Sequence, residues 1–139
     1  MRIAFITESF PKLSETFILG KAAMLTRLGH QVTVFTQFVR PGVHPSLLGA
    51  LNLRRDLVHL PVWDRVRFRD VTRALVGAGF NPGRMLRVGR AALGAPGGSL
   101  TLVKSLPFAR GEYDLLHAHY AHIGLRYLDV ASCLGLPLV

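Results

Sequence analysis

Apolar and polar positions along the chain follow two different periods, which predict strands and helices in turn. Residues 2–7 form a short apolar run rich in β-branched side chains, which predicts a buried strand. Residues 17–28 repeat apolar positions three and four apart, between a helix-capping Ser14 and a helix-ending Gly29. Residues 31–36 alternate polar and apolar side chains and predict a second strand. Strand, helix and strand in this order make a βαβ unit with parallel strands.

The rest of the chain continues this alternation. Residues 56–62 and 113–120 predict two more strands, and residues 123–134 predict a helix. Within residues 63–110, apolar residues have helical spacing in three segments, 68–76, 85–93 and 100–108. Breaks rich in glycine and proline separate these segments. The pattern predicts two or three helices outside the sheet. We therefore expect an α/β fold, with a Rossmann-like parallel sheet and flanking helices.

The last four residues, 136–139, have the pattern of a strand that is just beginning. A chain that stops there looks cut rather than completed, so we expect the domain to continue beyond Val139.

Composition narrows the class of protein. A chain of 139 residues, half of them hydrophobic, is the size of one domain and is too apolar for general disorder. Cys133 is the only cysteine, which excludes a disulfide scaffold. Every apolar stretch is shorter than the roughly 20 uncharged residues of a membrane-spanning helix, and the first is too short for a secretion signal. We therefore expect a cytoplasmic protein.

The charge of the chain points to anionic partners. Lysine and arginine number 17 against 8 acidic residues, which gives a net charge of +9. Such an excess favours nucleic acid, an anionic membrane or a phosphorylated ligand. Seven of the cations fall between Asp64 and Leu93: Arg65, Arg67, Arg69, Arg73, Arg84, Arg87 and Arg90.

The spacing of three of these arginines favours a membrane surface. Arg84, Arg87 and Arg90 lie on one flank of a predicted helix that also has an apolar side. That side is supplied by Met85, Leu86, Val88 and Leu93. A basic amphipathic helix can lie on an anionic bilayer. The alternative is a solvated helix face whose arginine stems cover apolar surface. We expect no nucleic-acid partner, because aromatic residues are not interleaved with the arginines and no nucleic-acid-binding motif is present.

Two segments fall at the carboxyl ends of predicted strands, where open parallel sheets bind ligands. The first is the loop that opens at Glu8 and brings Ser14, Glu15 and Thr16 to a helix N-terminus. Free N–H groups there attract phosphate. The alternative is a helix that is simply capped. No glycine-rich nucleotide fingerprint is present.

The second segment carries three histidines. His117 and His119 are two residues apart on a predicted strand and therefore share one face, and His122 follows Tyr120 at the next helix. The imidazoles fit contacts to a sugar hydroxyl or a phosphate, acid–base chemistry, or a structural role. A metal site is the third alternative, but the nearest acid, Asp114, is at the other end of the strand, so we expect no metal.

Several motifs together resemble a known enzyme family. Thr7-Glu-Ser-Phe-Pro-Lys-Leu-Ser-Glu-Thr-Phe-Ile18 is similar to the opening of retaining GT-B glycosyltransferases of family four, in the exopolysaccharide and colanic-acid-type branch. Leu28-Gly-His-Gln-Val-Thr-Val34 is similar to the family's approach to its second strand, and Tyr113-Asp-Leu-Leu-His-Ala-His-Tyr120 to its Asp-x-x-His-x-His-Phe strand. The family's Gly-Gly loop is replaced here by Lys12-Leu-Ser-Glu-Thr16.

The resemblance implies a two-domain bacterial enzyme of which residues 1–139 are part of the N-terminal, acceptor-side domain. A C-terminal domain, absent from this chain, would bind the nucleotide-sugar donor. His119, with His117 as second candidate, would contact the transferred sugar or the acceptor. The residues expected to bind substrate are Glu8, Ser14, Glu15, Thr16, Tyr120 and His122. No cofactor is implied, and the basic surface would suit a lipid-linked acceptor at the cytoplasmic face of the inner membrane.

Two other functions remain open. A Rossmann-like module can bind a phosphorylated ligand without chemistry, and a nucleotide-sugar epimerase can have the same two-domain architecture.

Overall fold

The computed structural model describes residues 1–12, 16–39, 57–60, 72, 82–94 and 98–139, with nothing stated for the side chain of Arg84. Its described strands form a four-stranded, all-parallel sheet in the order β3-β2-β1-β4. The strands are β1 (Arg2–Phe10), β2 (Gln31–Val39), β3 (Leu57–His59) and β4 (Leu115–Ala118). The expected α/β, Rossmann-like fold is confirmed.

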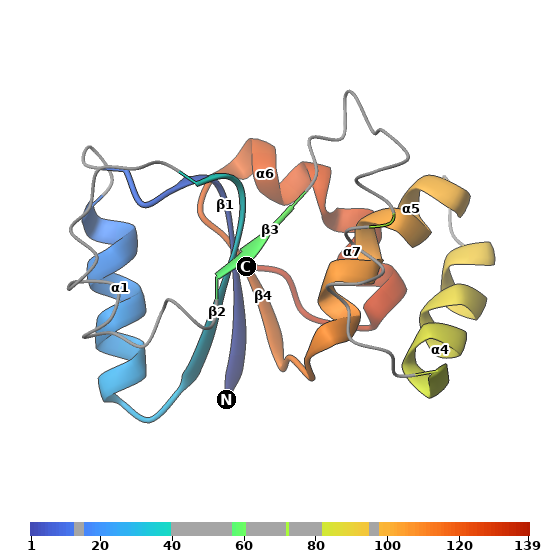
Figure 1. Ribbon diagram of the computed structural model, residues 1–139, viewed down its shortest axis with the longest axis horizontal. Coiled ribbons are helices and arrows are strands. Elements are labelled where there is room, and N and C mark those ends of the chain that lie inside the picture. The colour runs from blue at the N-terminus through green and yellow to red at the C-terminus, as the bar shows by residue number, and fades with distance from the viewer. Residues whose placement is uncertain (13–15, 40–56, 61–71, 73–81, 95–97) are drawn as a thin grey trace.

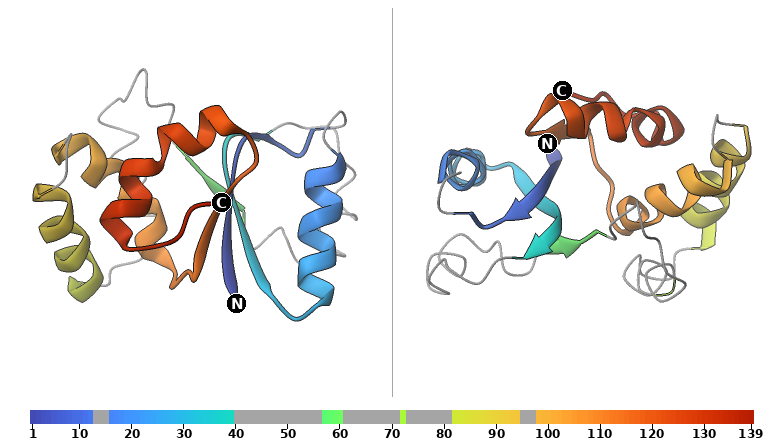
Figure 2. Two further views of the ribbon diagram at one scale, coloured as in Figure 1. Left: turned by 180° about the vertical axis from the view of Figure 1, so that it is seen from behind. Right: turned by 90° about the horizontal axis from the view of Figure 1, so that it is seen from above.

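The helices flank this sheet on two sides (Figures 1 and 2). They are α1 (Thr16–Arg27), α4 (Pro82–Leu93), α5 (Gly98–Ser105), α6 (Ala121–Arg126) and α7 (Leu128–Leu134), with a 3-10 helix η3 (Leu106–Arg110) after α5. Among the described helices, α1 alone covers one face of the sheet, and α5, η3, α6 and α7 cover the other, with α4 outermost.

Strand β1 lies at the centre of the sheet and separates two hydrophobic cores. Ile3 and Phe5 face α1 and pack with Ile18 and Ala22. The alternate residues, including Ile6, face the other side and pack with Leu116, Ile123, Tyr127 and Val130. This double burial explains why the first apolar run is continuous rather than alternating.

Strands β1 and β2 are longer than the sequence pattern predicts. Residues 2–7 and 31–36 are confirmed as strands, but β1 continues to Phe10 and β2 to Val39, with Ser9 paired to Phe38. Phe10 is buried in the core beneath α1. The burial of its ring keeps the chain in the sheet beyond the polar Glu8, so β1 continues to Phe10. Glu8 therefore lies in β1 and not in a loop.

The helix predicted over residues 123–134 is two helices. Helix α6 begins at Ala121 and ends at Arg126, and α7 begins at Leu128. Tyr127 between them is buried in the core and has a non-helical backbone, so its packing turns the chain at this point. Gly135 ends α7 in the left-handed conformation, with φ of 65°, as a helix-ending glycine does.

The predicted helices outside the sheet are present where the chain is described. Helix α4 spans residues 82–93 and α5 spans residues 98–105. The helix predicted over 100–108 therefore ends before Phe108, because the 3-10 helix η3, with Pro107 in its first turn, follows α5 directly. Phe108 stacks on Phe35 of β2 with ring centroids 4.3 Å apart, which joins the helical segment to the sheet. The helix predicted over 68–76 lies outside the described residues apart from Thr72.

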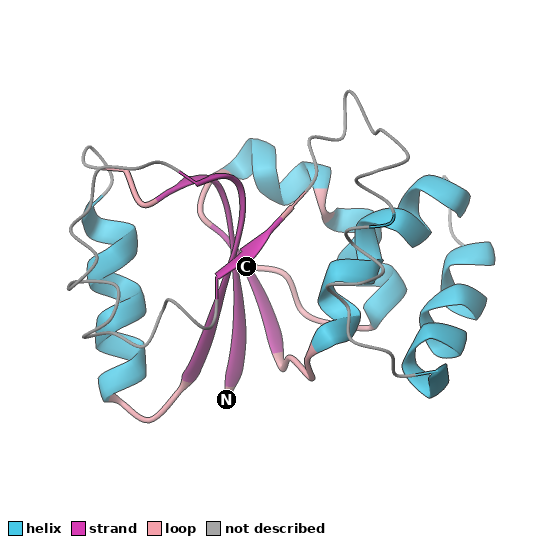
Figure 3. Cartoon of the chain, viewed as in Figure 1, coloured by secondary structure: helices cyan, strands magenta, loops and turns pink. Residues whose placement is uncertain are grey.

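The C-terminal residues pair with the free edge of β4. Leu138 forms an isolated parallel bridge with Leu116. The N–H of Leu116 donates to the carbonyl of Pro137 at 2.9 Å, and that of Ala118 to the carbonyl of Val139 at 2.8 Å. This pairing agrees with the strand that the sequence predicts to begin here, although Figure 3 draws these residues as loop.

A partly buried ion pair fastens α5 to α7. The Lys104 ammonium donates to Asp129 Oδ2 at 2.9 Å and to the carbonyl of Arg126 at 3.0 Å. Thr101 donates to the same carboxylate at 3.1 Å. The side chains of Lys104 and Asp129 are only 11% and 26% exposed, so neither charge is fully hydrated.

We predict that Asp129→Asn destabilises the fold by about 2–4 kcal/mol, because it leaves the Lys104 charge largely buried without its counter-charge. Lys104→Met should cost less, since Asp129 keeps Thr101 and more contact with water. Urea denaturation measures both. Glu112→Gln is the control, because its ion pair with Arg2 is exposed and should contribute less than about 1 kcal/mol. Equal costs for Asp129→Asn and Glu112→Gln would contradict this account.

Candidate functional site

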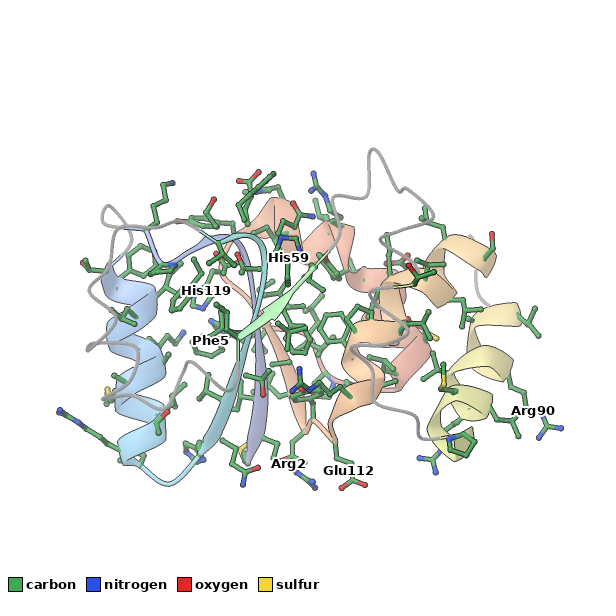
Figure 4. The ribbon with its side chains drawn as sticks, viewed as in Figure 1. Arg2, Phe5, His59, Arg90, Glu112 and His119 are labelled. Atoms are coloured by element: carbon green, nitrogen blue, oxygen red, sulfur yellow. The ribbon has the colours of Figure 1, made fainter. Side chains whose placement is uncertain are left out.

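The carboxyl end of the sheet brings together the ends of β1 and β4 and the start of α6. The N–H of His119 donates to the carbonyl of Ile6 at 3.2 Å, so the chain is still bonded to β1 when it leaves β4. Tyr120 then begins α6. Figure 4 shows His119 and Phe5 near each other beside α1, away from Arg2 and Glu112, which lie at the opposite end of the strands.

The two candidate catalytic histidines lie together on the α1 side. Their rings are 4.7 Å apart, and both pack on Phe5, at 5.0 Å for His117 and 4.6 Å for His119. The prediction that they share one face is confirmed. Phe17, in the first turn of α1, approaches the His119 ring at 6.4 Å. The His119 ring is therefore held between aromatic residues at the end of the sheet, and its Nε2 is shielded from solvent.

His117 lies one step further from the edge and has a different environment. The Lys21 ammonium, on α1, is 3.0 Å from His117 Nε2, which accepts that hydrogen bond only when the ring is neutral. Burial of the ring, and then the charge of Lys21, lower the pKa of His117 from its ordinary value of 6.5. His117 is thus a neutral residue at physiological pH, already bonded to a neighbouring cation.

A second group of polar side chains lies on the other side of the sheet. They surround a small hollow lined by Ile6, Thr7, Glu8, Gln37, His122, Ile123, Arg126 and Tyr127. Its accessible volume is about 10 Å³, which is room for one water-sized group. The strands contribute Glu8 and Gln37, and α6 contributes His122 and Arg126 one turn apart. We call this the α6 hollow.

The structure divides the residues that the sequence grouped as one site. His117 and His119 lie on the α1 side, whereas His122 lies in the α6 hollow with Glu8. Tyr120 stacks on His122 with ring centroids 5.6 Å apart. Thr16 is the exposed first residue of α1. Ser14 and Glu15 lie outside the described residues.

Sequence reasoning missed two residues of the hollow, Gln37 and Arg126. Arg126 follows His122 by four residues, a spacing that places both on one side of a helix and was available as a signal. Gln37 had no such signal, because the sequence pattern ended the second strand at residue 36. Its position depends on the extension of β2 alongside β1.

The basic patch is described only in part. Arg65, Arg67, Arg69 and Arg73 lie outside the described residues, as does the Arg84 side chain. Arg87 and Arg90 are exposed on α4, and Figure 4 shows Arg90 pointing away from the body of the protein. Leu86 and Leu93 are exposed beside them, at 61% and 83%.

The expected apolar side of this helix needs one correction. Val88 is not part of the outer surface: it is buried, and its carbonyl receives a weak contact from Cys133 Sγ at 3.8 Å. Helix α4 rests on α5 and α7 through Val88 and Ala92, while Leu86 and Leu93 remain on the outer side.

Metal ligands and membrane-spanning helices were sought among the described residues. No group of three or more histidine, cysteine, aspartate or glutamate side chains there is arranged to hold a metal ion. None of the helices in that part of the chain has the length and hydrophobicity to cross a bilayer. Comparison of the chain with protein-family models, curated proteins and solved structures gave no match.

We predict that stability falls as the pH drops below about 6.5, because the unfolded chain then binds a proton that folded His117 resists. Lys21→Met should raise the pKa of His117 only part of the way to its ordinary value, since burial, the larger cause, remains. A histidine-ring NMR titration measures that pKa. Arg27→Met removes a charge from the last turn of the same helix and serves as control. An unchanged His117 pKa in Lys21→Met would contradict the contact.

Proposed function

We propose that this chain is the acceptor-side domain of a retaining glycosyltransferase with two Rossmann-like halves. The enzyme would move a sugar from a nucleotide-sugar donor to a glycan acceptor carried on a lipid. The observation that carries the proposal is the position of His119, packed between Phe5 and Phe17 at the carboxyl end of β4. Open parallel sheets bind their ligands at this edge.

Sugar transfer makes demands that such a site can meet. The bond between the anomeric carbon and the diphosphate oxygen breaks, a bond to the acceptor oxygen forms, and the acceptor hydroxyl loses its proton. The reaction needs positioning of the sugar and stabilisation of the leaving diphosphate more than it needs a metal. A histidine ring held by aromatic neighbours can position a sugar hydroxyl through a hydrogen bond.

Between the two candidates, we assign the sugar contact to His119. His117 is further from the edge of the sheet, and its Nε2 is engaged with Lys21. In this proposal His117 is a positioning residue, which supports the His119 ring at 4.7 Å. The donor diphosphate would be bound by the second half of the enzyme, so we expect the 139-residue chain alone to transfer no sugar.

We predict that His119→Ala lowers the transfer rate at least about a hundredfold in the enzyme that contains both halves, because positioning contributes strongly to such reactions. Release of the nucleoside diphosphate from candidate nucleotide sugars measures the rate. His30→Ala is the matched control, because His30 lies at the turn before β2, at the amino end of the sheet. Unchanged turnover in a folded His119→Ala protein would reject the assignment.

A binding module without chemistry is the second candidate function. The α6 hollow favours it, because polar side chains from two strands and a helix surround it. Mass spectrometry of the native protein separates the two functions. A mass well above 15.3 kDa, with a second α/β half, supports the transferase, and a product that ends at Val139 supports the module.

The proposal includes peripheral contact with an anionic membrane at the cytoplasmic face. Its support is the outer surface of α4, where exposed leucines adjoin Arg87 and Arg90 and where the helix has no acidic residue. Apolar side chains beside cations suit the boundary between lipid headgroups and acyl chains. The net charge of +9 adds a general attraction to anionic lipid.

We predict that Arg87→Gln with Arg90→Gln weakens binding to phosphatidylglycerol-containing vesicles by roughly thirtyfold, since each cation contributes about 1 kcal/mol. Co-sedimentation measures the bound fraction. Arg27→Gln with Arg110→Gln removes the same charge from elsewhere on the surface and should have a smaller effect. Equal losses in the two double variants would show that only the total charge matters, and would reject α4 as the contact.

A further inference from the structure

Helix α1 presents an exposed aromatic side chain next to the histidine pair. Phe17, in the first turn of α1, contacts the His119 ring edge to face, with ring centroids 6.4 Å apart and ring planes at 66°. Phe17 is nevertheless 57% exposed. More than half of this aromatic residue is therefore open to solvent beside the end of β4, where open parallel sheets bind ligands.

Gly20 lies one turn after Phe17 on the same side of the helix. It is exposed, and no atom of the described residues lies within 4 Å of the position that a Cβ would occupy. Its backbone is helical, so any residue could adopt it. A glycine inside a helix costs stability relative to alanine. Neither packing nor backbone conformation in the described structure requires this glycine, whereas close approach of a ligand to the helix would require it.

Lys21 brings a cation to the same side of α1. It follows Phe17 by four residues, a spacing that makes the two side chains neighbours on a helix. Its ammonium lies 3.0 Å from His117 Nε2. The rings of His117 and His119 are 4.7 Å apart, so Phe17 and Lys21 contact adjacent members of one cluster. An ammonium has three N–H groups and His117 accepts from one of them, so Lys21 can also donate to a ligand.

We infer that Phe17, Gly20 and Lys21, which we call the α1 platform, bind one pyranose ring of a glycan. Phe17 stacks against the C–H face of the sugar, and Gly20 leaves room for the ring to approach the helix. Lys21 donates a hydrogen bond to a sugar hydroxyl. Ligand sites commonly combine an aromatic surface with a few polar groups in this way.

The chemistry of the α1 platform selects this class of ligand. A pyranose ring has an apolar C–H face and hydroxyl groups around its edge, so it fits both Phe17 and Lys21. An aliphatic chain fits only Phe17, and a free anion fits only Lys21. A nucleobase also stacks on aromatic rings, so a nucleoside belongs among the probes.

The identification of this glycan as the acceptor rests on the proposed function, in which His119 contacts the sugar and Phe17 is its neighbour. The binding itself does not depend on sugar transfer, so it is measured with the 139-residue chain and no donor. The probes are methyl β-glucopyranoside, methyl β-galactopyranoside, glycerol and uridine. NMR of the ¹⁵N-labelled chain follows the backbone amide of Gly20 and the ring of His119.

We expect at least one of the two glycosides to shift both signals and to bind about tenfold or more tightly than glycerol, which has hydroxyls but no ring face. Saturation of the aromatic protons of the protein should pass to the C–H protons of the bound sugar. Uridine should bind more weakly than that glycoside, because the hydrogen bond from Lys21 is placed for a sugar hydroxyl.

Variants of Phe17 test the stacking contact. Phe17→Ala should weaken glycoside binding about tenfold or more, and Phe17→Trp should retain it, because the larger ring offers the same surface. Leu28→Ala is the matched control. Leu28 follows α1 directly and is 62% exposed, so its loss removes a similar apolar surface away from the histidines and should leave binding unchanged.

Lys21→Met tests the polar contact. It should weaken glycoside binding about tenfold, the effect of one hydrogen bond to a charged group. Arg27→Met removes a cation from the last turn of α1 and should leave binding unchanged.

Gly20→Ala separates a ligand contact from a structural role. Alanine favours the helix, so the melting temperature should rise by about 2–6 °C. The added methyl group takes the space of the sugar ring, so binding should weaken at least about fivefold. Gly89→Ala is the control inside α4, where no atom of the described residues lies within 4 Å of the Cβ position either. It should raise the melting temperature and leave binding unchanged.

The inference is overturned if neither glycoside shifts the Gly20 signal at millimolar concentration, or if uridine binds more tightly than both. Equal binding by Phe17→Ala and Leu28→Ala, or by Gly20→Ala and Gly89→Ala, would also overturn it. Its failure is distinct from failure of the proposed function, which is read from transfer by His119→Ala. Binding without any transfer would support the α1 platform and reject only its assignment to an acceptor.

Discussion

The position of β1 between β2 and β4 is the constraint on which the rest of the structure depends. This strand is hydrogen-bonded along both edges and buried on both faces. Burial on both faces requires a helix layer on each side, and each layer is anchored on alternate residues of β1. The two candidate sites lie on opposite sides of the sheet because this one strand supplies residues to both.

This separation suggests a division of roles within the proposed function. On the α1 side, His117 and His119 form a compact aromatic group with Phe5, and burial, together with the charge of Lys21, lowers the pKa of His117 and keeps it neutral. On the α6 side, the carboxylate of Glu8, the amide of Gln37 and the basic side chains of α6 surround a small hollow. The first arrangement suits orientation of a neutral hydroxyl, and the second has room for one water-sized group. A substrate that reached both would have to pass over the carboxyl ends of the strands.

The outer helices are attached by a different kind of interaction. Apolar contacts of Phe108 and Val88 bring the segment near the sheet, and the ion pair of Lys104 with Asp129 sets the alignment of α5 against α7. A partly buried ion pair contributes alignment more than net stability, since desolvation offsets most of its attraction. Helix α4, which is outermost, keeps Leu86 and Leu93 exposed.

The sequence alone determined the order of the elements, the α/β class and the shared face of His117 and His119, because these follow from the periods of apolar residues, 2 for strands and 3.6 for helices. Tertiary structure decided what those local periods do not contain. Burial of Phe10 extended β1 past Glu8, and Tyr127 in the core broke one expected helix into two. Only the pairing of β1 with β2, followed by the packing of α6, brought Gln37 and Arg126 to one hollow, because the meeting of two residues 89 positions apart depends on the folded sheet and not on neighbouring residues.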